Sequence, residues 1–208
     1  MVSWVYQESG DGRHLLMGAF YVNTTVYGPA QGELAAALSD RVAFVSPTVR
    51  RCTLILDEAC ESQSQEEIIS FSAVLSYRFR CPVLSVGVHD DDALFYWLHR
   101  EGRFIDLYLS NPSAFVSPGG LVLESVGGNA DVLAESFGVA VTPRLRAALR
   151  TSHGFDSKFV TETARHQDLV AALELPPFSV GLGYGYFQRG DVPGVSTSNF
   201  LATAQAQG

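Results

Sequence analysis

Residues 64–109, SQEEIISFSAVLSYRFRCPVLSVGVHDDDALFYWLHREGRFIDLYL, carry the clearest structural pattern in the chain. Ser64 and Glu67 have the spacing of a capping box, in which the two residues satisfy each other's backbone amides at the start of a helix. The apolar residues that follow return at helical spacing, as Ile68, Phe71, Val74, Leu75 and Phe79. Pro82 ends the pattern because its ring disfavours helical geometry in the residue before it. The stretch therefore predicts a helix that begins after Ser64 and stops before Pro82.

Three apolar runs follow this helix and predict strands over 83–88, 93–99 and 104–109. An Asp-rich turn at 90–92 joins the first two strands, and Glu101-Gly102 joins the second to the third. Connections this short place consecutive strands side by side in antiparallel order. The sequence thus predicts a β-meander directly after the helix.

The rest of the chain has shorter patterns. Further strands are expected over 1–6, 15–21, 53–56 and 178–187, the first two as an opening hairpin. Further helices are expected over 33–38, from Asn129 to Gly138, from Pro143, and over 161–173. Together these elements predict an α+β (mixed α/β) fold, with a single predominantly antiparallel sheet flanked by helices, which we expect on one face of the sheet.

The chain of 208 residues contains no Pro/Gly/Ser-rich or charged run that would separate two domains. We therefore expect one domain over residues 1–195 and a flexible tail over residues 196–208. Apolar residues make up 47% of the sequence, so a chain of this length can bury a core without disulfides or metals.

The charge of the chain bears on its partners and its compartment. A net charge of −8 with scattered basic residues argues against nucleic acid, and no apolar run reaches the roughly 20 residues of a membrane span. Three cysteines without metal-site spacing, and the lack of an export signal, predict buried thiols in a cytoplasmic protein. Lys158 is the one lysine beside many arginines, which indicates a GC-rich bacterial genome.

The segment Val180-Gly-Leu-Gly-Tyr-Gly-Tyr186 alternates glycine with larger residues, so an extended strand would have one nearly bare face. Something must pack closely against such a face. A helix of the same protein is one candidate, and a ligand or a protein partner is the other. The predicted ligand- or partner-binding residues are Gly181, Gly183, Tyr184, Gly185 and Tyr186.

The sequence His89-Asp90-Asp91-Asp92 gathers an imidazole and three carboxylates at the end of a predicted strand. Oxygen ligands of this kind hold Mg²⁺, Mn²⁺ or Ca²⁺, and Asp57 at the end of a neighbouring strand could join them. The predicted metal ligands are therefore His89, Asp90, Asp92 and Asp57. The competing interpretation is a tight turn, in which aspartates bond their own backbone. No other cofactor is predicted.

Other candidate groups have simpler interpretations. Gly127-Gly128-Asn129 could present amides to an anion, but the pattern is typical of a helix N-cap. Arg144, Arg146 and Arg150 are expected on a solvated helix face, and His99, His153 and His166 in structural roles.

The motifs contain no complete catalytic set and do not single out a known family. The leading hypothesis is a non-enzymatic binding or regulatory module that acts through protein contacts or a small ligand at the sheet. The first alternative is a metal-dependent hydrolase that uses the His89, Asp90 and Asp92 turn to activate water. The second alternative is a structural homo-oligomer formed by pairing of exposed sheet edges.

Overall fold

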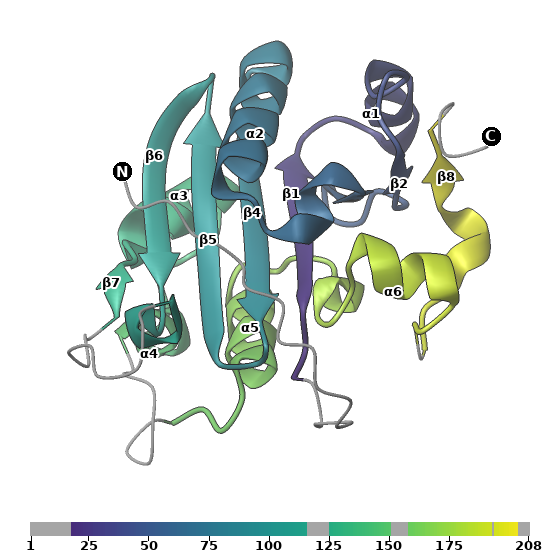
Figure 1. Cartoon of the computed structure of the whole chain (residues 1–208). Coiled ribbons are helices and arrows are strands. Elements are labelled where there is room, and N and C mark those ends of the chain that lie inside the picture. Colours follow the sequence, from purple (N-terminus) through teal and green to yellow (C-terminus); the bar gives the residue numbers. More distant parts are fainter. Residues whose placement is uncertain (1–17, 116–124, 151–157, 193, 204–208) are drawn as a thin grey trace, which may run out of the picture.

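A computed structural model describes residues 18–115, 125–150, 158–192 and 194–203. Its centre is one antiparallel sheet with the strand order β7-β6-β5-β4-β1-β3-β2-β8 (Figure 1). The strands are β1 (Tyr21–Tyr27), β2 (Ala43–Val45), β3 (Cys52–Asp57), β4 (Pro82–His89), β5 (Ala93–Arg100), β6 (Arg103–Leu109), β7 (Val126–Gly127) and β8 (Leu201–Ala202). The helices are α1 (Gln31–Ala37), α2 (Gln65–Phe79), α3 (Ala130–Phe137), α4 (Pro143–Arg150), α5 (Glu162–Ala172) and α6 (Tyr184–Arg189), with short 3₁₀ turns at Ala59–Ser62, Pro112–Phe115, Pro177–Ser179 and Thr197–Asn199.

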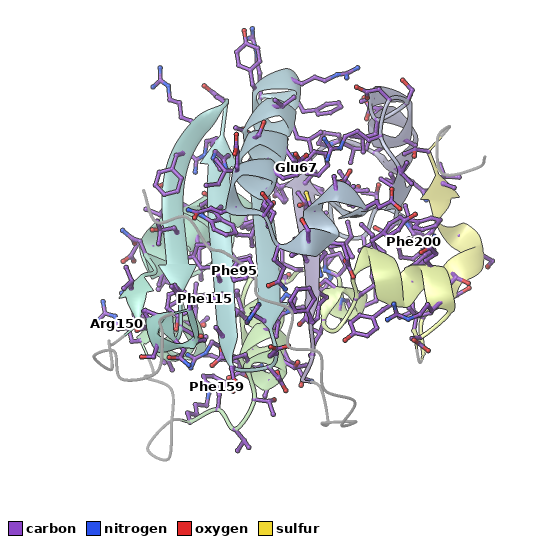
Figure 2. All side chains as sticks on the ribbon, viewed as in Figure 1. Glu67, Phe95, Phe115, Arg150, Phe159 and Phe200 are labelled. Carbon is purple, nitrogen blue, oxygen red and sulfur yellow. The ribbon has the colours of Figure 1, made fainter. Side chains whose placement is uncertain are left out.

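The helix and meander predicted over 64–109 are confirmed. The Ser64 side chain accepts a hydrogen bond from the amide of Glu67, the residue that Figure 2 labels near the start of α2. The helix ends at Arg80, which adopts a left-handed conformation (φ 49°) just before β4. Strands β4, β5 and β6 then pair in sequence, with one bulge between Leu98 and His99. The predicted α+β class with a single antiparallel sheet therefore holds.

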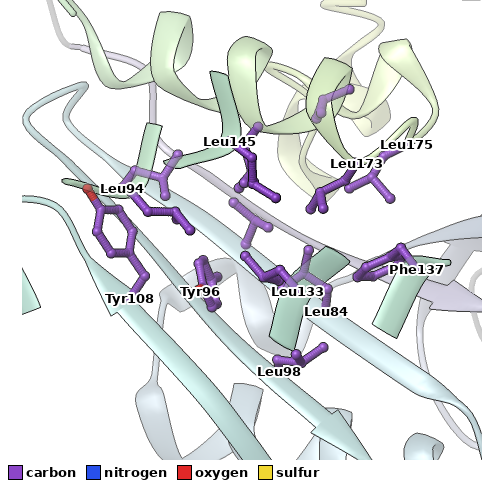
Figure 3. Close-up of a cluster of buried hydrophobic side chains, with 14 of the residues drawn as sticks. Leu84, Leu94, Tyr96, Leu98, Tyr108, Leu133, Phe137, Leu145, Leu173 and Leu175 are labelled. Atoms are coloured by element: carbon purple, nitrogen blue, oxygen red, sulfur yellow. The ribbon is translucent and has the colours of Figure 1, made fainter. Parts of the chain in front are cut away.

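Helices cover both faces of the sheet, so the expectation that they lie on one face is wrong. Helices α3, α4 and α5 pack on one face, where Leu84, Tyr96, Leu98 and Tyr108 of the sheet meet Leu133, Phe137, Leu145, Leu173 and Leu175 (Figure 3). Helices α1 and α2 pack on the other face, over Val22, Val26, Ile55, Val83 and Phe95. Successive residues of a strand point to opposite faces, and in β1, β3, β4 and β5 nearly all of them are buried. Strands whose residues are apolar on both faces must be covered by other elements on both sides of the sheet.

The strand predicted over 178–187 is wrong, because this segment forms a 3₁₀ turn followed by α6. The carboxylate of Glu61 accepts hydrogen bonds from the amides of Tyr184 and Gly185, both at 3.1 Å, and so caps the first turn of α6. A Cβ atom at Gly183 would lie 2.7 Å from Cβ of Tyr21. The glycines therefore serve a close approach inside the protein, as the alternation indicated, but on a helix rather than a strand.

Two of the remaining expectations concern the ends of the chain. Residues 1–17, and with them most of the predicted opening hairpin, lie outside the described residues, and β1 pairs with β3 and β4 on its two edges. Within the segment expected as a tail, β8 pairs with β2, and the Thr203 amide donates to the Ala43 carbonyl at 3.0 Å.

All three cysteines are buried and free of disulfides, as predicted. Among the described residues, none of the helices combines the length and the apolar character of a membrane span.

Candidate functional site

A pocket of about 330 Å³ lies where β1 ends and β3 begins. The two strands contribute Tyr27 and Cys52, and the hairpin turn before β3 contributes Arg50. The opposite wall comes from the ends of two helices that cover the sheet. These are Phe137 with the following residues 138–140 after α3, and Leu173 with Glu174 after α5.

The pocket lies over buried apolar side chains, but its exposed lining is mostly polar. The ring of Tyr27 meets that of Phe137 edge-on with centroids 5.7 Å apart, and Leu173 and Cys52 are both 2% exposed. Burial raises the pKa of the Cys52 thiol to about 11, so it stays protonated at neutral pH. A protonated, buried thiol acts as a small apolar surface rather than as a nucleophile.

The mouth of the pocket is charged. Nη1 of Arg50 lies 3.4 Å from Oε2 of Glu174, and the two side chains are 68% and 61% exposed. Exposed pairs of this kind contribute less than about 1 kcal/mol, so this one can open easily. The guanidinium of the adjacent Arg51 lies 4.7 Å from the centre of the Tyr27 ring.

The backbone around the mouth is held in a conformation that suits glycine better than the residues present. Arg50 (φ 50°) and Arg51 (φ 67°) are the two central residues of the hairpin turn between Val49 and Cys52, whose backbones exchange hydrogen bonds of 2.8 and 2.9 Å. Such turns favour Asn-Gly, because both central residues are left-handed.

Glu174 (φ 54°) occupies a second position of this type. The Leu175 amide bonds to the Val170 carbonyl at 3.0 Å, so α5 ends in a Schellman motif whose left-handed residue is usually glycine. A side chain in this conformation costs of the order of 1 kcal/mol. Two such residues, Arg50 and Glu174, therefore line one pocket, and backbone strain beside a pocket is a reason to look for a function.

The sequence gives little signal for this site. Tyr27, Arg50, Phe137 and Glu174 are far apart in the chain and converge only through the sheet and its helices. The available signal is local. Arg50-Arg51 stands between apolar runs where a tight turn would favour Asn or Gly, and Glu174 follows a helix at the position where Gly is expected.

The glycine and tyrosine residues predicted for binding lie at the start of α6 and just before it. Gly183 and Tyr184 are buried, and the Tyr184 ring stacks on Phe44 with centroids 5.3 Å apart. Gly185 contacts Glu61, and the hydroxyl of Tyr186 accepts a hydrogen bond from the Phe20 amide at 3.3 Å. Gly181 precedes the helix in a left-handed conformation (φ 74°).

The Asp-rich turn is a tight hairpin turn at the other end of the sheet. Asp90 (φ 49°) and Asp91 (φ 57°) are its central residues, and the Asp92 amide donates to the His89 carbonyl at 2.9 Å. His89 pairs through Nδ1 with Oε1 of Gln63 at 2.8 Å, and its Nε2 lies 3.8 Å from Oδ2 of Asp90. The Oδ1 atom of Asp91 accepts hydrogen bonds from the amide and the hydroxyl of Thr163, at 2.7 and 2.8 Å.

The fourth predicted ligand, Asp57, belongs to a different group of residues. Within the described part of the chain, one set of ligand atoms lies within 4.8 Å of one another, and it comes from Asp57, Cys60 and Glu67. The guanidinium of Arg41 already binds this set, with contacts of 2.6 and 2.7 Å to Asp57 and 2.7 Å to Glu67. Arg41 thus supplies the positive charge that these carboxylates need, and Asp57 is not grouped with His89, Asp90 and Asp92.

A second pocket, of about 340 Å³, surrounds the start of α3. Its backbone donors are already used, because Oδ1 of Asn129 accepts from the amides of Asp131 and Val132, and the Asn129 amide donates to Asp106. This confirms the predicted N-cap at Asn129. Arg146 pairs with Asp131 at 2.9 Å, so its charge is also balanced within the cluster.

The histidines that the structure describes are held in buried polar contacts. Nδ1 of His166 lies 2.7 Å from the Tyr21 hydroxyl, and complete burial lowers the pKa of His166 to about 3. Nδ1 of His99 lies 2.9 Å from Oγ of Ser72, a distance that suits a nucleophile and its base. However, Ser72 is fully buried and its hydroxyl already donates to the Ile68 carbonyl at 2.8 Å, which fits a structural role.

The pocket between the Arg50-Arg51 turn and the end of α5 therefore combines a mostly polar lining, a weak ion pair and strained backbone. Comparison with protein-family models, with curated proteins and with solved structures found no match to this chain.

Proposed function

We propose that the protein is a non-enzymatic binding module that takes up a small ligand in the pocket between the Arg50-Arg51 turn and the end of α5. One observation carries this proposal. The ion pair between Arg50 and Glu174 at the mouth is formed by two residues whose backbones occupy conformations that favour Asn or Gly. Charged residues occupy left-handed positions elsewhere, at Arg80 and Glu101, but Arg50 and Glu174 are distinguished by meeting across a pocket.

The chemistry of the lining supports recognition. Polar groups in a ligand site fix the orientation of the ligand. Here Arg50 and Glu174 provide charges of both signs, and the half-buried ring of Tyr27 provides an apolar contact. Phe137 and Leu173 are almost completely buried and lie behind this lining. Because the ion pair is exposed and weak, a ligand can replace it at a small cost in free energy.

The proposed ligand site differs from the one that the sequence indicated at residues 181–186. The space beside Gly183 and Gly185 is filled by Tyr21 and Glu61 of the same chain. The pocket at the end of β1 instead has an unfilled volume of about 330 Å³. This lies at the lower end of the range of small-molecule sites, about 300–1,000 Å³.

Thermal unfolding against a panel of metabolites, nucleotides and divalent metals tests this proposal. A ligand present at 100 times its dissociation constant stabilises the folded state by about 2.7 kcal/mol. We expect at least one organic ligand to raise the melting temperature of the wild-type protein. Glu174→Gly should abolish that rise, because it removes the carboxylate from the mouth.

Glu101→Gly is the matched control. Glu101 is also a left-handed glutamate (φ 53°), but it lies in the turn between β5 and β6 and does not line the pocket. The control should keep the full ligand response. If no organic ligand shifts the wild-type transition, or if Glu174→Gly responds like wild type, the proposed site is wrong. A shift by metal alone that Asp90→Asn removes would instead support the hydrolase alternative.

A further inference from the structure

The charges around the pocket do not favour an ion of either sign. Arg50 and Arg51 lie on one side of the mouth, and Glu174 lies on the other. A simple anion bound by the arginines would meet the carboxylate of Glu174. A simple cation bound by Glu174 would meet two guanidinium groups. A molecule that carries both charges can satisfy both sides.

Two helix ends strengthen the negative side. Helix α3 ends at Phe137 and helix α5 ends at Ala172, and the residues directly after both helices line the pocket. The C-terminal end of a helix carries about half a negative elementary charge, which favours a cation nearby. An ammonium group would therefore find its most favourable position beside Glu174 and these two helix ends.

The other side of the mouth suits a carboxylate. Guanidinium groups bind carboxylates through two parallel hydrogen bonds, and Arg50 is free to turn because its side chain is 68% exposed. The guanidinium of Arg51 lies over the Tyr27 ring, which holds it next to the same wall. The half-buried ring of Tyr27 can then contact the part of the ligand that lies between the two charges.

We propose that the ligand is a free amino acid. Its carboxylate would bind Arg50, and its ammonium would replace Arg50 as the partner of Glu174. Its side chain would lie beside the ring of Tyr27. This inference rests on the proposed function, since it names the class of ligand for the same pocket. The terminal residues of a peptide do not fit equally well, because each carries one of the two charges.

Isothermal titration calorimetry with L-phenylalanine, N-acetyl-L-phenylalanine and L-phenylalaninamide tests the class of ligand. The second compound lacks the ammonium and the third lacks the carboxylate. We expect L-phenylalanine to bind and each blocked compound to bind at least about tenfold more weakly, since each loses one charged contact. In Glu174→Gln the acetylated compound should bind as well as the amino acid, and in Arg50→Gln the amide should do so.

The outcomes separate this inference from the proposed function. If both blocked compounds bind as tightly as L-phenylalanine, or if L-phenylalanine fails to bind while another ligand gives a thermal shift that depends on Glu174, the ligand class is wrong and the site stands. If no compound shifts the wild-type protein, the proposed site itself fails. If both variants keep the preference for L-phenylalanine over the two blocked compounds, the charges of Arg50 and Glu174 do not determine which ligand binds.

Discussion

Two tight turns at opposite ends of the sheet have the same backbone geometry, but the charged residues at their left-handed positions have different roles. Arg50-Arg51 precedes β3, which starts beside the end of β1, and Asp90-Asp91 follows β4, which ends beside the start of β1. Aspartate tolerates the left-handed conformation, and Asp91 uses its carboxylate to cap α5 through Thr163. Arg51 lies over the Tyr27 ring and donates to its hydroxyl at 3.4 Å, whereas Arg50 pairs with the exposed Glu174. The chemically suggestive aspartates are thus explained by folding, whereas the ordinary-looking Arg50 is not.

Helix α5 runs from the Asp91 turn towards the pocket at the other end of the sheet. A buried histidine within this helix makes the stability of the fold depend on pH. The first turn of α5 docks on Asp91, and its His166 is buried against Tyr21 with a pKa of about 3, below the value of about 6.5 in the unfolded chain. Between these values the unfolded chain binds more protons, so stability falls as the pH falls from 6.5 towards 3. The slope from this residue alone should reach about 1.4 kcal/mol per pH unit.

Urea unfolding at pH 7.5, 6.5, 5.5 and 5.0 measures this slope. His166→Gln keeps a hydrogen-bonding partner for the Tyr21 hydroxyl and removes the titration. It should flatten the loss of stability over this range, leaving the smaller contribution of His99, whose pKa burial also lowers. An unchanged slope in His166→Gln would mean that His166 is not the group that is protonated on unfolding.

The next largest effect should come from the Asp-rich turn. Asp91→Gly removes the acceptor of two hydrogen bonds from Thr163 at the start of α5. Loss of two hydrogen bonds to a charged acceptor costs about 2 kcal/mol, and relief of the left-handed conformation offsets about 1 kcal/mol of it. We expect a net destabilisation of about 1 kcal/mol in urea unfolding. Asp90→Gly, whose side chain does not cap the helix, should be neutral or stabilising, and equal losses in the two variants would remove the contrast.

The same kind of replacement should have the opposite sign in the other turn. Changing Arg50 to Asn and Arg51 to Gly places the preferred residues at both left-handed positions. The double variant should be more stable by about 0.5–1 kcal/mol, after the loss of the contact between Arg51 and the Tyr27 ring. It should also lose the ligand-induced thermal shift. Destabilisation of this variant would indicate that the arginines hold the fold together after all.

The smallest effect should come from the ion pair alone. Arg50→Ala breaks the contact with Glu174 but leaves the turn in place, and the exposed pair contributes less than about 1 kcal/mol. Urea unfolding of Arg50→Ala and of the matched exposed-pair variant Arg189→Ala should therefore give midpoints close to wild type. A loss above about 1 kcal/mol in Arg50→Ala alone would assign the pair to stability rather than to binding.

Local patterns in the sequence were sufficient for the regular elements and insufficient for their arrangement. Capping at Ser64 and Asn129 and the short turns of the meander are interactions between near neighbours, so they can be read directly. The segment 178–187 was wrongly predicted because its helix depends on Glu61, more than a hundred residues earlier. Alternate glycines imitate the two-residue period of a strand, and nothing local reveals the distant carboxylate.

The candidate site was missed for the same reason. Its residues come from two strands, a turn and two helix ends. Strands such as β3 and β4 are buried on both faces, so their sequences do not show which face lies near a pocket. The metal hypothesis placed Asp57 beside His89 because their strands were expected to be neighbours, but β1 lies between β3 and β4. In the structure the Asp57 carboxylate instead binds Arg41, and the spacing of residues along the sequence does not predict this contact.

The pairing of β8 with β2 bears on how this chain avoids self-association while it folds. Strand β2 is only three residues long, and its outer edge is covered by Leu201 and Ala202, which come very late in the described chain. Until those residues are available, the edge of β2 presents free backbone donors and acceptors to other molecules. A truncation before Leu201 should therefore leave a largely folded sheet in which the edge of β2 stays unpaired, and the shortened protein should aggregate both during refolding and afterwards.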